Sequence, residues 1–141
     1  MSCLSPPLIK LGQRVLLLGL RSDVADCLAA SDVSVLTSDY EGVSNSLMES
    51  MSAGVPVVST RYPGADELVT DGHDGHLVPC RDARALSDRL SKLLGDPEER
   101  ERIGRNGLRT IGTHYSIDAM AAGLVAVYED RLRHAKRSGA A

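Results

Sequence analysis

The chain has 141 residues, of which 43% are hydrophobic and 25% charged, a composition typical of one soluble globular domain and unlike that of a disordered segment. Its formal charge of -3 gives no basic surface for nucleic acid, and the three cysteines lack the CxxC spacing of a zinc site or an even-numbered disulfide framework. No apolar run approaches the roughly 20 residues that span a bilayer. Together with the charge and the cysteine pattern, this predicts a cytoplasmic protein that does not bind nucleic acid.

The first half of the sequence alternates short apolar runs with helical patterns, as expected for a parallel sheet with crossover helices. A short helix is predicted after Asp23, which we expect to cap it, and a second helix from about residue 44 to Ala53. Gly54 then provides the left-handed residue that often follows a helix. The apolar runs predict strands at residues 15–18, 33–36, 55–58 and 76–78.

From residue 82 onward the apolar spacing is helical. Leucines predict one amphipathic helix up to about residue 94, and residues 97 to about 113 predict a second. The apolar stripe of a third helix consists of Ile117, Met120, Leu124, Tyr128 and Leu132. The pattern predicts one α/β domain over residues 1–135, followed by a flexible tail at residues 136–141.

One loop, residues 38–44, follows the carboxyl end of a predicted strand and opens a helix, which is where open α/β sheets bind ligands. Free N–H groups at the helix start and the positive end of the helix dipole favour an anion such as a phosphate. Glu41 and Glu49 flank this anion site, and their carboxylates suit hydroxyl-rich groups, such as the sugar and the ribose on either side of a diphosphate. Other interpretations stay open: Ser46 and Glu49 also form a capping-box pattern, and Glu41 also fits a solvated surface residue.

The same stretch carries a family resemblance. The run EGVSNSLMESMSAGVPVVST (residues 41–60), followed by PGADELVTDGHDGHLVP (residues 63–79), resembles the donor-binding half of retaining family-4 glycosyltransferases. Their pattern is EGxxNxxxEAxAxGxPVVxT and then GGxxEhhxDGxxGhhhP, where h is apolar, and the likeness covers roughly residues 8 to 133. It implies a Rossmann-like parallel sheet with flanking helices, part of a GT-B C-terminal domain.

The resemblance also implies roles for individual residues. Glu49 would bind the ribose of the donor nucleotide, and Glu41 would contact the donor sugar as the catalytic residue. The donor would be a nucleoside-diphosphate sugar, with UDP favoured over GDP or ADP, and the acceptor a sugar or a lipid-linked molecule, with no cofactor and no metal. The predicted substrate-binding residues are Gly19, Leu20, Arg21, Glu41, Gly42, Val43, Ser44, Asn45, Ser46, Leu47 and Glu49.

Two further patterns allow a ligand, but we favour structural roles for both. The run DGHDGH, residues 71–76, has two histidines among two aspartates, yet the family has a plain Asp-Gly turn there. A basic cluster near the C-terminus would contact anionic lipid or, as we favour, complement a helix dipole. This cluster consists of Arg131, Arg133, His134, Lys136 and Arg137.

In the family, an acceptor domain and an Arg/Lys pair that clamps the diphosphate precede the segment matched here. We therefore expect a donor domain truncated at its N-terminus and inactive alone; the alternative is a non-catalytic nucleotide-sugar-binding or regulatory module completed by a partner chain. A receiver-like signalling domain would need a carboxylate cluster that Asp32 and Asp39 do not supply. By resemblance the full donor domain has a sheet in the strand order 3-2-1-4-5-6, and its two central strands are missing from the segment matched here. We therefore expect residues 15–18 to pair directly with residues 33–36. We also expect self-association through an exposed sheet edge.

Overall fold

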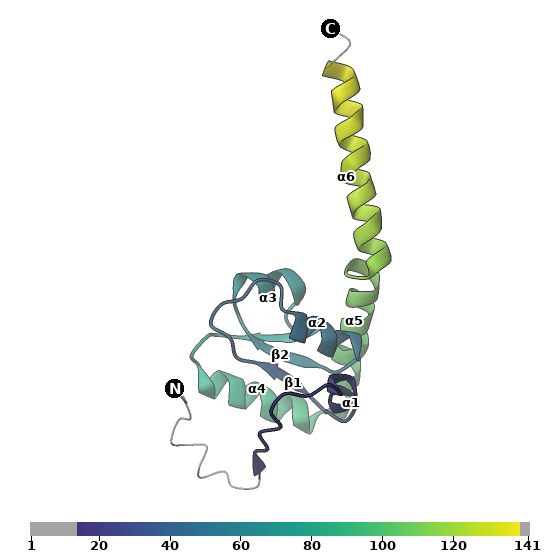
Figure 1. Ribbon diagram of the computed structural model, residues 1–141. Helices are drawn as coiled ribbons and strands as arrows, with labels where there is room; N and C mark the ends of the chain where they lie inside the picture. Colours follow the sequence, from purple (N-terminus) through teal and green to yellow (C-terminus); the bar gives the residue numbers. More distant parts are fainter. Residues whose placement is uncertain (1–13, 139–141) are drawn as a thin grey trace.

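The computed structural model describes residues 14–138, which form an α/β domain with a parallel sheet and flanking helices (Figure 1). The elements are α1 (Val24–Ala29), β1 (Ser34–Leu36), α2 (Asn45–Ser52), β2 (Val57–Thr60), α3 (Pro63–Leu68), β3 (His76–Val78), α4 (Ala83–Gly95), α5 (Pro97–His114) and α6 (Ile117–Ser138). The three strands lie in the order β1-β2-β3 and are parallel, with Leu36 opposite Ser59 and Ser59 opposite Leu77. All three carboxyl ends therefore meet at one edge of the sheet, as the predicted α/β fold requires.

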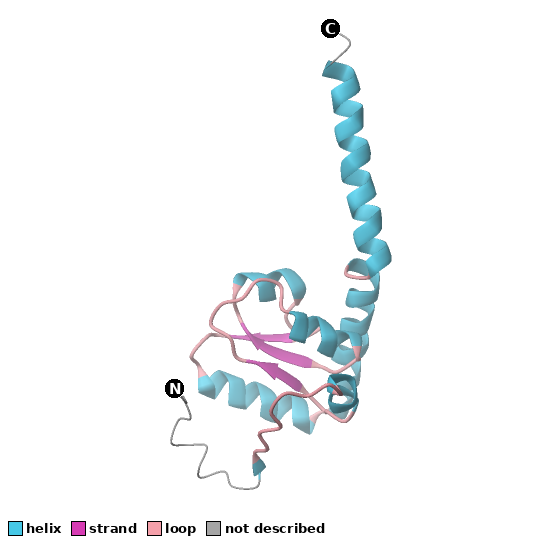
Figure 2. Ribbon diagram, viewed as in Figure 1, coloured by secondary structure: helices cyan, strands magenta, loops and turns pink. Residues whose placement is uncertain are grey.

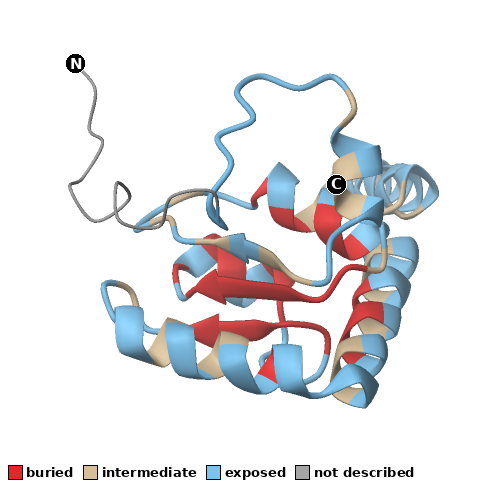
Figure 3. Cartoon of the chain, turned by 90° about the horizontal axis from the view of Figure 1, so that it is seen from below, coloured by how far each residue is buried: buried red, intermediate tan, exposed pale blue. Residues whose placement is uncertain are grey.

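Helices cover both faces of this sheet (Figure 2). Because successive strand residues point to opposite faces, Val57 and Leu77 pack with α2 and α3, whereas Val58 and Val78 pack with Leu93 of α4. Figure 3 shows that burial is concentrated in β2, β3 and the helix faces that contact them. The core is thus centred on the β2–β3 pair, while β1 lies at the edge with Val35 42% exposed.

Helix α5 packs across the amino-terminal edge of the sheet. A Cβ atom on Gly104 would lie 2.1 Å from the Gly54 carbonyl oxygen, and one on Gly107 would lie 3.2 Å from the Asp74 carbonyl oxygen. Both contacted residues come just before a strand, so α5 closes the amino edge. The loops that follow the strands lie at the opposite, carboxyl edge.

Several local predictions are confirmed. Helix α2 begins at Asn45, and Gly54 behind it has φ +72. The strand at residues 76–78 forms as predicted, and the later helices begin behind Asp82 and Asp96, whose carboxylates each accept a hydrogen bond of 2.9 Å from a first-turn N–H. The predicted strand at 55–58 begins two residues later, at Val57, because the Val55 N–H still donates to the Ser50 carbonyl at the end of α2.

The prediction of a buried strand at residues 15–18 is wrong. Val15, Leu16, Leu17 and Leu18 are all exposed and form no strand, and they do not pair with β1. A strand needs a hydrogen-bonded neighbour, and among residues 14–138 the one strand that pairs with β1 is β2. Asp23 occupies the N-cap position of α1 as predicted, but its carboxylate pairs with Arg21 and makes no capping hydrogen bond. Helix α3 was not predicted from the sequence.

Helix α6 forms as predicted but projects away from the α/β body (Figure 1). Its apolar stripe is more than half exposed, from Ile117 at 80% to Leu124 at 55%. The helix continues to Ser138, past the predicted domain end at residue 135, and residues 139–141 lie outside the described part of the chain. Within residues 14–138 no helix has the length and apolarity needed to cross a membrane.

Candidate functional site

The loop between β1 and α2, residues 37–44 and here named the Glu41 loop, lies at the carboxyl edge of the sheet. It delivers Ser44 as the N-cap of α2 in an extended conformation, and the Ser44 side chain makes no capping hydrogen bond. The N–H groups of Asn45, Ser46 and Leu47 point out of the first turn, where a helix has no partners of its own for them. The helix start therefore presents unpaired donors and a positive dipole end, which favour an anion.

Contacts from two neighbouring elements and one hydrogen bond within the loop hold the Glu41 loop in place. The Thr60 hydroxyl, at the end of β2, donates to the Ser38 carbonyl at 2.5 Å. Within the loop, the Ser38 hydroxyl donates to the Glu41 carboxylate. Gly64 of α3 approaches the loop so closely that a Cβ atom there would lie 2.0 Å from the Gly42 carbonyl oxygen. The half-buried Glu41 carboxylate is thus held on an oriented loop.

Glu49 lies on the exposed face of α2, and its side chain makes no hydrogen bond or ion pair with any described residue. The capping-box interpretation of Ser46 and Glu49 is wrong, because the N-cap is Ser44 and Glu49 is five residues beyond it. A pocket of about 420 Å³ separates α1 from this face of α2. Its lining residues are Val24, Ala25, Leu28, Glu49, Ser52 and Ala53. Glu49 therefore offers an unpaired carboxylate to a largely apolar pocket.

Gly19, Leu20 and Arg21 precede α1 and are exposed. Gly19 adopts φ +65, and the Arg21 guanidinium pairs with Asp23 and holds the pKa of that carboxyl below its usual value. These three residues do not line the pocket that contains Glu49. The structure thus brings Glu49 together with α1 itself.

Tyr62 was missed by the sequence analysis. It precedes α3, is only 3% exposed, and its hydroxyl group has no hydrogen-bond partner among the described residues. Burial raises the pKa of the Tyr62 phenol, and the Glu41 carboxylate adds to this rise. The position of Tyr62 beside the Glu41 loop depends on the packing of α3, so no local sequence signal could reveal it.

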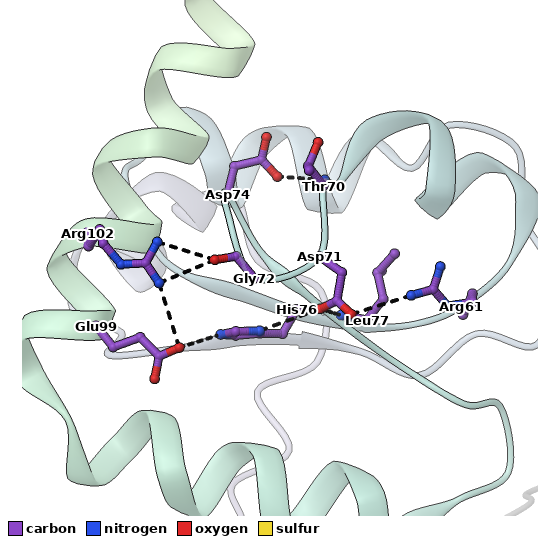
Figure 4. Close-up of polar contacts among 9 residues, drawn as sticks. All are labelled: Arg61, Thr70, Asp71, Gly72, Asp74, His76, Leu77, Glu99 and Arg102. Atoms are coloured by element: carbon purple, nitrogen blue, oxygen red, sulfur yellow. Dashed lines mark hydrogen bonds and ion pairs between the residues drawn. The ribbon is translucent and has the colours of Figure 1, made fainter.

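The two aspartates of the DGHDGH turn accept hydrogen bonds from the backbone (Figure 4). Asp71 accepts a hydrogen bond from the Leu77 N–H at 3.0 Å, and Asp74 accepts one from the Thr70 N–H at 2.7 Å. These carboxylates close the turn that leads into β3. Within residues 14–138 no three His, Cys, Asp or Glu side chains are grouped so as to hold a metal ion.

His76 and Glu99 connect this turn to α5 (Figure 4). The His76 ring is 1% exposed, and its Nε2 atom lies 3.1 Å from Glu99 Oε1. Arg102 of α5 pairs with Glu99 and donates to the Gly72 carbonyl. Burial lowers the pKa of His76, with a further contribution from Arg89, against the opposing effect of Glu99 and Asp71.

Comparison with known proteins decides the family. Residues 9–110 match the family described as glycosyl transferases group 1. The chain belongs to this family. The match covers the Glu41 loop, α2 and the turn before β3, so it rests on the same segment as the candidate site.

The chain is similar to a synthase and to a mannosyltransferase. The chain is 32% identical over 123 residues to N-acetyl-alpha-D-glucosaminyl L-malate synthase from Bacillus anthracis, which covers 87% of this chain and 32% of that protein. It is 38% identical over 108 residues to MMP alpha-(1->4)-mannosyltransferase from Mycolicibacterium hassiacum, which covers 76% of this chain and 26% of that protein. The chain therefore spans only about a quarter to a third of these relatives.

Solved structures agree with the fold. Anabaena HepE in complex with UDP matches with a TM-score of 0.82 and 25% identity, over 88% of this chain and 34% of that one. Sucrose-phosphate synthase from Thermosynechococcus elongatus matches with a TM-score of 0.81 and 28% identity, over 91% of this chain and 33% of that one. The predicted Rossmann-like α/β fold of GT-B glycosyltransferases is confirmed.

Proposed function

We propose that this chain is the donor-binding part of a retaining family-4 glycosyltransferase, and that it binds a nucleoside-diphosphate sugar. The observation that carries the proposal is that one helix, α2, combines an uncapped start behind the Glu41 loop with an unpaired carboxylate, Glu49, in the pocket next to α1. In a nucleoside-diphosphate sugar, the anionic diphosphate lies between the sugar and the ribose, so its groups follow the order of Glu41, the start of α2 and Glu49. UDP is the favoured nucleotide, since the related HepE has been solved with UDP and with UDP-glucose; GDP and ADP are the alternatives.

Each part of the donor has a proposed partner. The diphosphate receives hydrogen bonds from the amides at the start of α2, from Gly42 to Leu47, where the helix dipole favours negative charge. Glu49 accepts hydrogen bonds from the ribose hydroxyls, and the base lies toward Gly19, Leu20 and Arg21. Glu41, oriented by the Ser38 hydroxyl, contacts the donor sugar.

Catalysis in this proposal depends on holding the sugar in place and on stabilising the departing diphosphate. The chain supplies the helix amides for this charge and Glu41 for the sugar. The acceptor, a sugar or a lipid-linked molecule, has no proposed binding residues here. We therefore expect no sugar transfer by this chain alone.

A second proposal concerns completion of the site by another chain. The free edge of β1 and the exposed apolar residues 15–18 favour association, because an unprotected edge strand can pair with a further strand. The occupant would be either a second copy or a partner chain, and in the latter case the protein would be a non-catalytic nucleotide-sugar-binding module. A monomer in light scattering that also unfolds cooperatively in a thermal titration would contradict self-association.

Calorimetric titration of the chain with UDP, GDP and ADP tests the main proposal. We expect saturable binding with UDP bound most tightly. UMP serves as the control, because it lacks the second phosphate and should bind more weakly than UDP if the α2 amides contact the diphosphate. Failure of every nucleotide to bind at millimolar concentration would refute a working donor site.

A further inference from the structure

The connection between β3 and α4 contains an unusual backbone conformation at Arg81. Arg81 has φ +61 and is the sole non-glycine residue with a positive φ among residues 14–138. Side chains with a Cβ atom rarely adopt this region because the Cβ atom crowds the following carbonyl group. The connection itself is short, since Asp82 already caps α4 through the Ala85 N–H at 2.9 Å. A glycine would make the same turn without strain, so the arginine side chain must serve another purpose.

The Arg81 side chain contacts the Glu41 loop. Its Nη2 and Nε atoms lie 2.8 and 3.2 Å from Asp39 Oδ2, which joins two segments 42 residues apart in sequence. The Arg81 guanidinium also holds the pKa of Asp39 below its usual value. Both side chains are more than half exposed, at 83% and 56%, and such surface pairs contribute little to stability. The stability of the ion pair therefore does not account for a strained residue at this position.

The surroundings of Asp39 suggest why the loop needs this contact. On the α2 and α3 side, the loop packs directly against Gly64. On the α4 side it borders a pocket of about 270 Å³. The lining residues of this pocket include Thr37, Asp39, Thr60, Pro79, Arg81 and Leu86. On this side the Thr60 hydroxyl donates to the Ser38 carbonyl at 2.5 Å, and Cys80 Sγ lies 4.0 Å from the Ser38 and Asp39 carbonyl oxygens. Within the described part of the chain, the Asp39 side chain itself is held by Arg81 alone, at the rim of the pocket.

We propose that Arg81 is a positioning residue: its guanidinium holds Asp39 across this pocket and so fixes the Glu41 loop and the start of α2 in the geometry that receives the donor. The strained backbone at Arg81 is the cost of that arrangement. The effect of Arg81 on donor binding rests on the proposed function. Its restraint on the loop does not require a ligand.

Three variants test the proposal. Arg81→Gly removes the restraint and also relieves the strain, so we expect its Tm to rise by about 2–4 °C. In the same variant, backbone order parameters of residues 38–44, measured by ¹⁵N relaxation without nucleotide, should fall from about 0.85 toward 0.6. Asp39→Ala removes the carboxylate that Arg81 binds but keeps the strain, so it should loosen the loop equally without raising the Tm. Arg84→Ala is the matched control, because it removes an exposed arginine from the Arg84–Asp88 pair on α4, and it should leave the loop unchanged.

Affinity for UDP provides the second readout. Both loop variants should bind UDP about two- to fivefold more weakly than the wild type, the range that an exposed ion pair supports, and the double variant should show no further loss. Wild-type order parameters in Arg81→Gly would overturn the proposal. If the wild type binds no nucleotide, the proposed function fails, while the order parameters still decide whether Arg81 restrains the loop.

Discussion

Substituting Gly64 by alanine should displace the Glu41 loop. The new Cβ atom would lie 2.0 Å from the Gly42 carbonyl oxygen and 2.9 Å from the Val43 nitrogen. Since non-bonded heavy atoms need roughly 3.5 Å, the loop or α3 must retreat by about 1.5 Å. Overpacking of this kind costs about 1–3 kcal/mol, offset by up to about 1 kcal/mol from the better helix propensity of alanine. The net loss of roughly 1–2 kcal/mol should lower the Tm by about 3–8 °C.

The same displacement should weaken nucleotide binding. Each charge-assisted hydrogen bond from an α2 amide to a phosphate is worth about 1.5–3 kcal/mol, so losing one should raise the Kd for UDP at least about tenfold. Thermal unfolding by circular dichroism and calorimetric titration with UDP measure the two effects. The titrations should be carried out well below the Tm of the variant, so that a lower measured affinity does not reflect a smaller folded fraction.

Two other glycines provide the controls. Gly104→Ala meets the Gly54 carbonyl oxygen at 2.1 Å, at the opposite edge of the sheet, so it should lower the Tm comparably and leave the Kd for UDP unchanged. Gly112→Ala, within α5, meets nothing within 4 Å and should raise the unfolding free energy by up to about 1 kcal/mol. A Gly64→Ala protein with wild-type Tm and wild-type affinity would refute the reasoning. Equal losses of affinity in Gly64→Ala and Gly104→Ala would show that stability, and not loop position, controls binding.

Three further predictions concern the carboxylates of the site and the buried histidine. Glu49→Gln should weaken UDP binding by roughly 10- to 150-fold with little change in Tm, because the side chain has no partner in the described structure; calorimetry that gives equal affinity for both proteins would end the ribose assignment. Glu41→Ala should lower affinity for UDP-sugars more than for free UDP, and unchanged discrimination between the two ligands would argue against a contact with the sugar. Burial holds the pKa of His76 below 6.5, so the unfolded chain binds more protons and the unfolding free energy should fall as the pH drops below about 6.5. Urea titrations of the wild type and His76→Gln between pH 5 and 7.5 check this, and a wild type that gains stability on acidification through His76 would contradict it.

Local sequence patterns were sufficient to predict most helices and the loop-to-helix junction at which the candidate site is proposed. Each of these features depends on residues close together in sequence: the apolar spacing of the helices and the glycine behind α2 at residue 54. The same holds for the placement of Glu41 on the loop and of Glu49 within α2. A pattern confined to one helix does not depend on what packs around it, whereas the conformation of the flanking loop does.

Tertiary structure decided the features that need a distant partner. The apolar run at residues 15–18 resembles a buried strand in sequence, but strand formation depends on hydrogen bonds to a neighbour that a short apolar run cannot specify. The apolar stripe of α6 predicted a helix correctly and said nothing about what covers it. The approach of Gly64 to Gly42, the buried Tyr62 hydroxyl and the Arg81–Asp39 pair arise only when α3 and the β3–α4 connection pack against the Glu41 loop. Contacts between segments 20 or more residues apart depend on how the whole sheet assembles, and no periodicity within a segment encodes them.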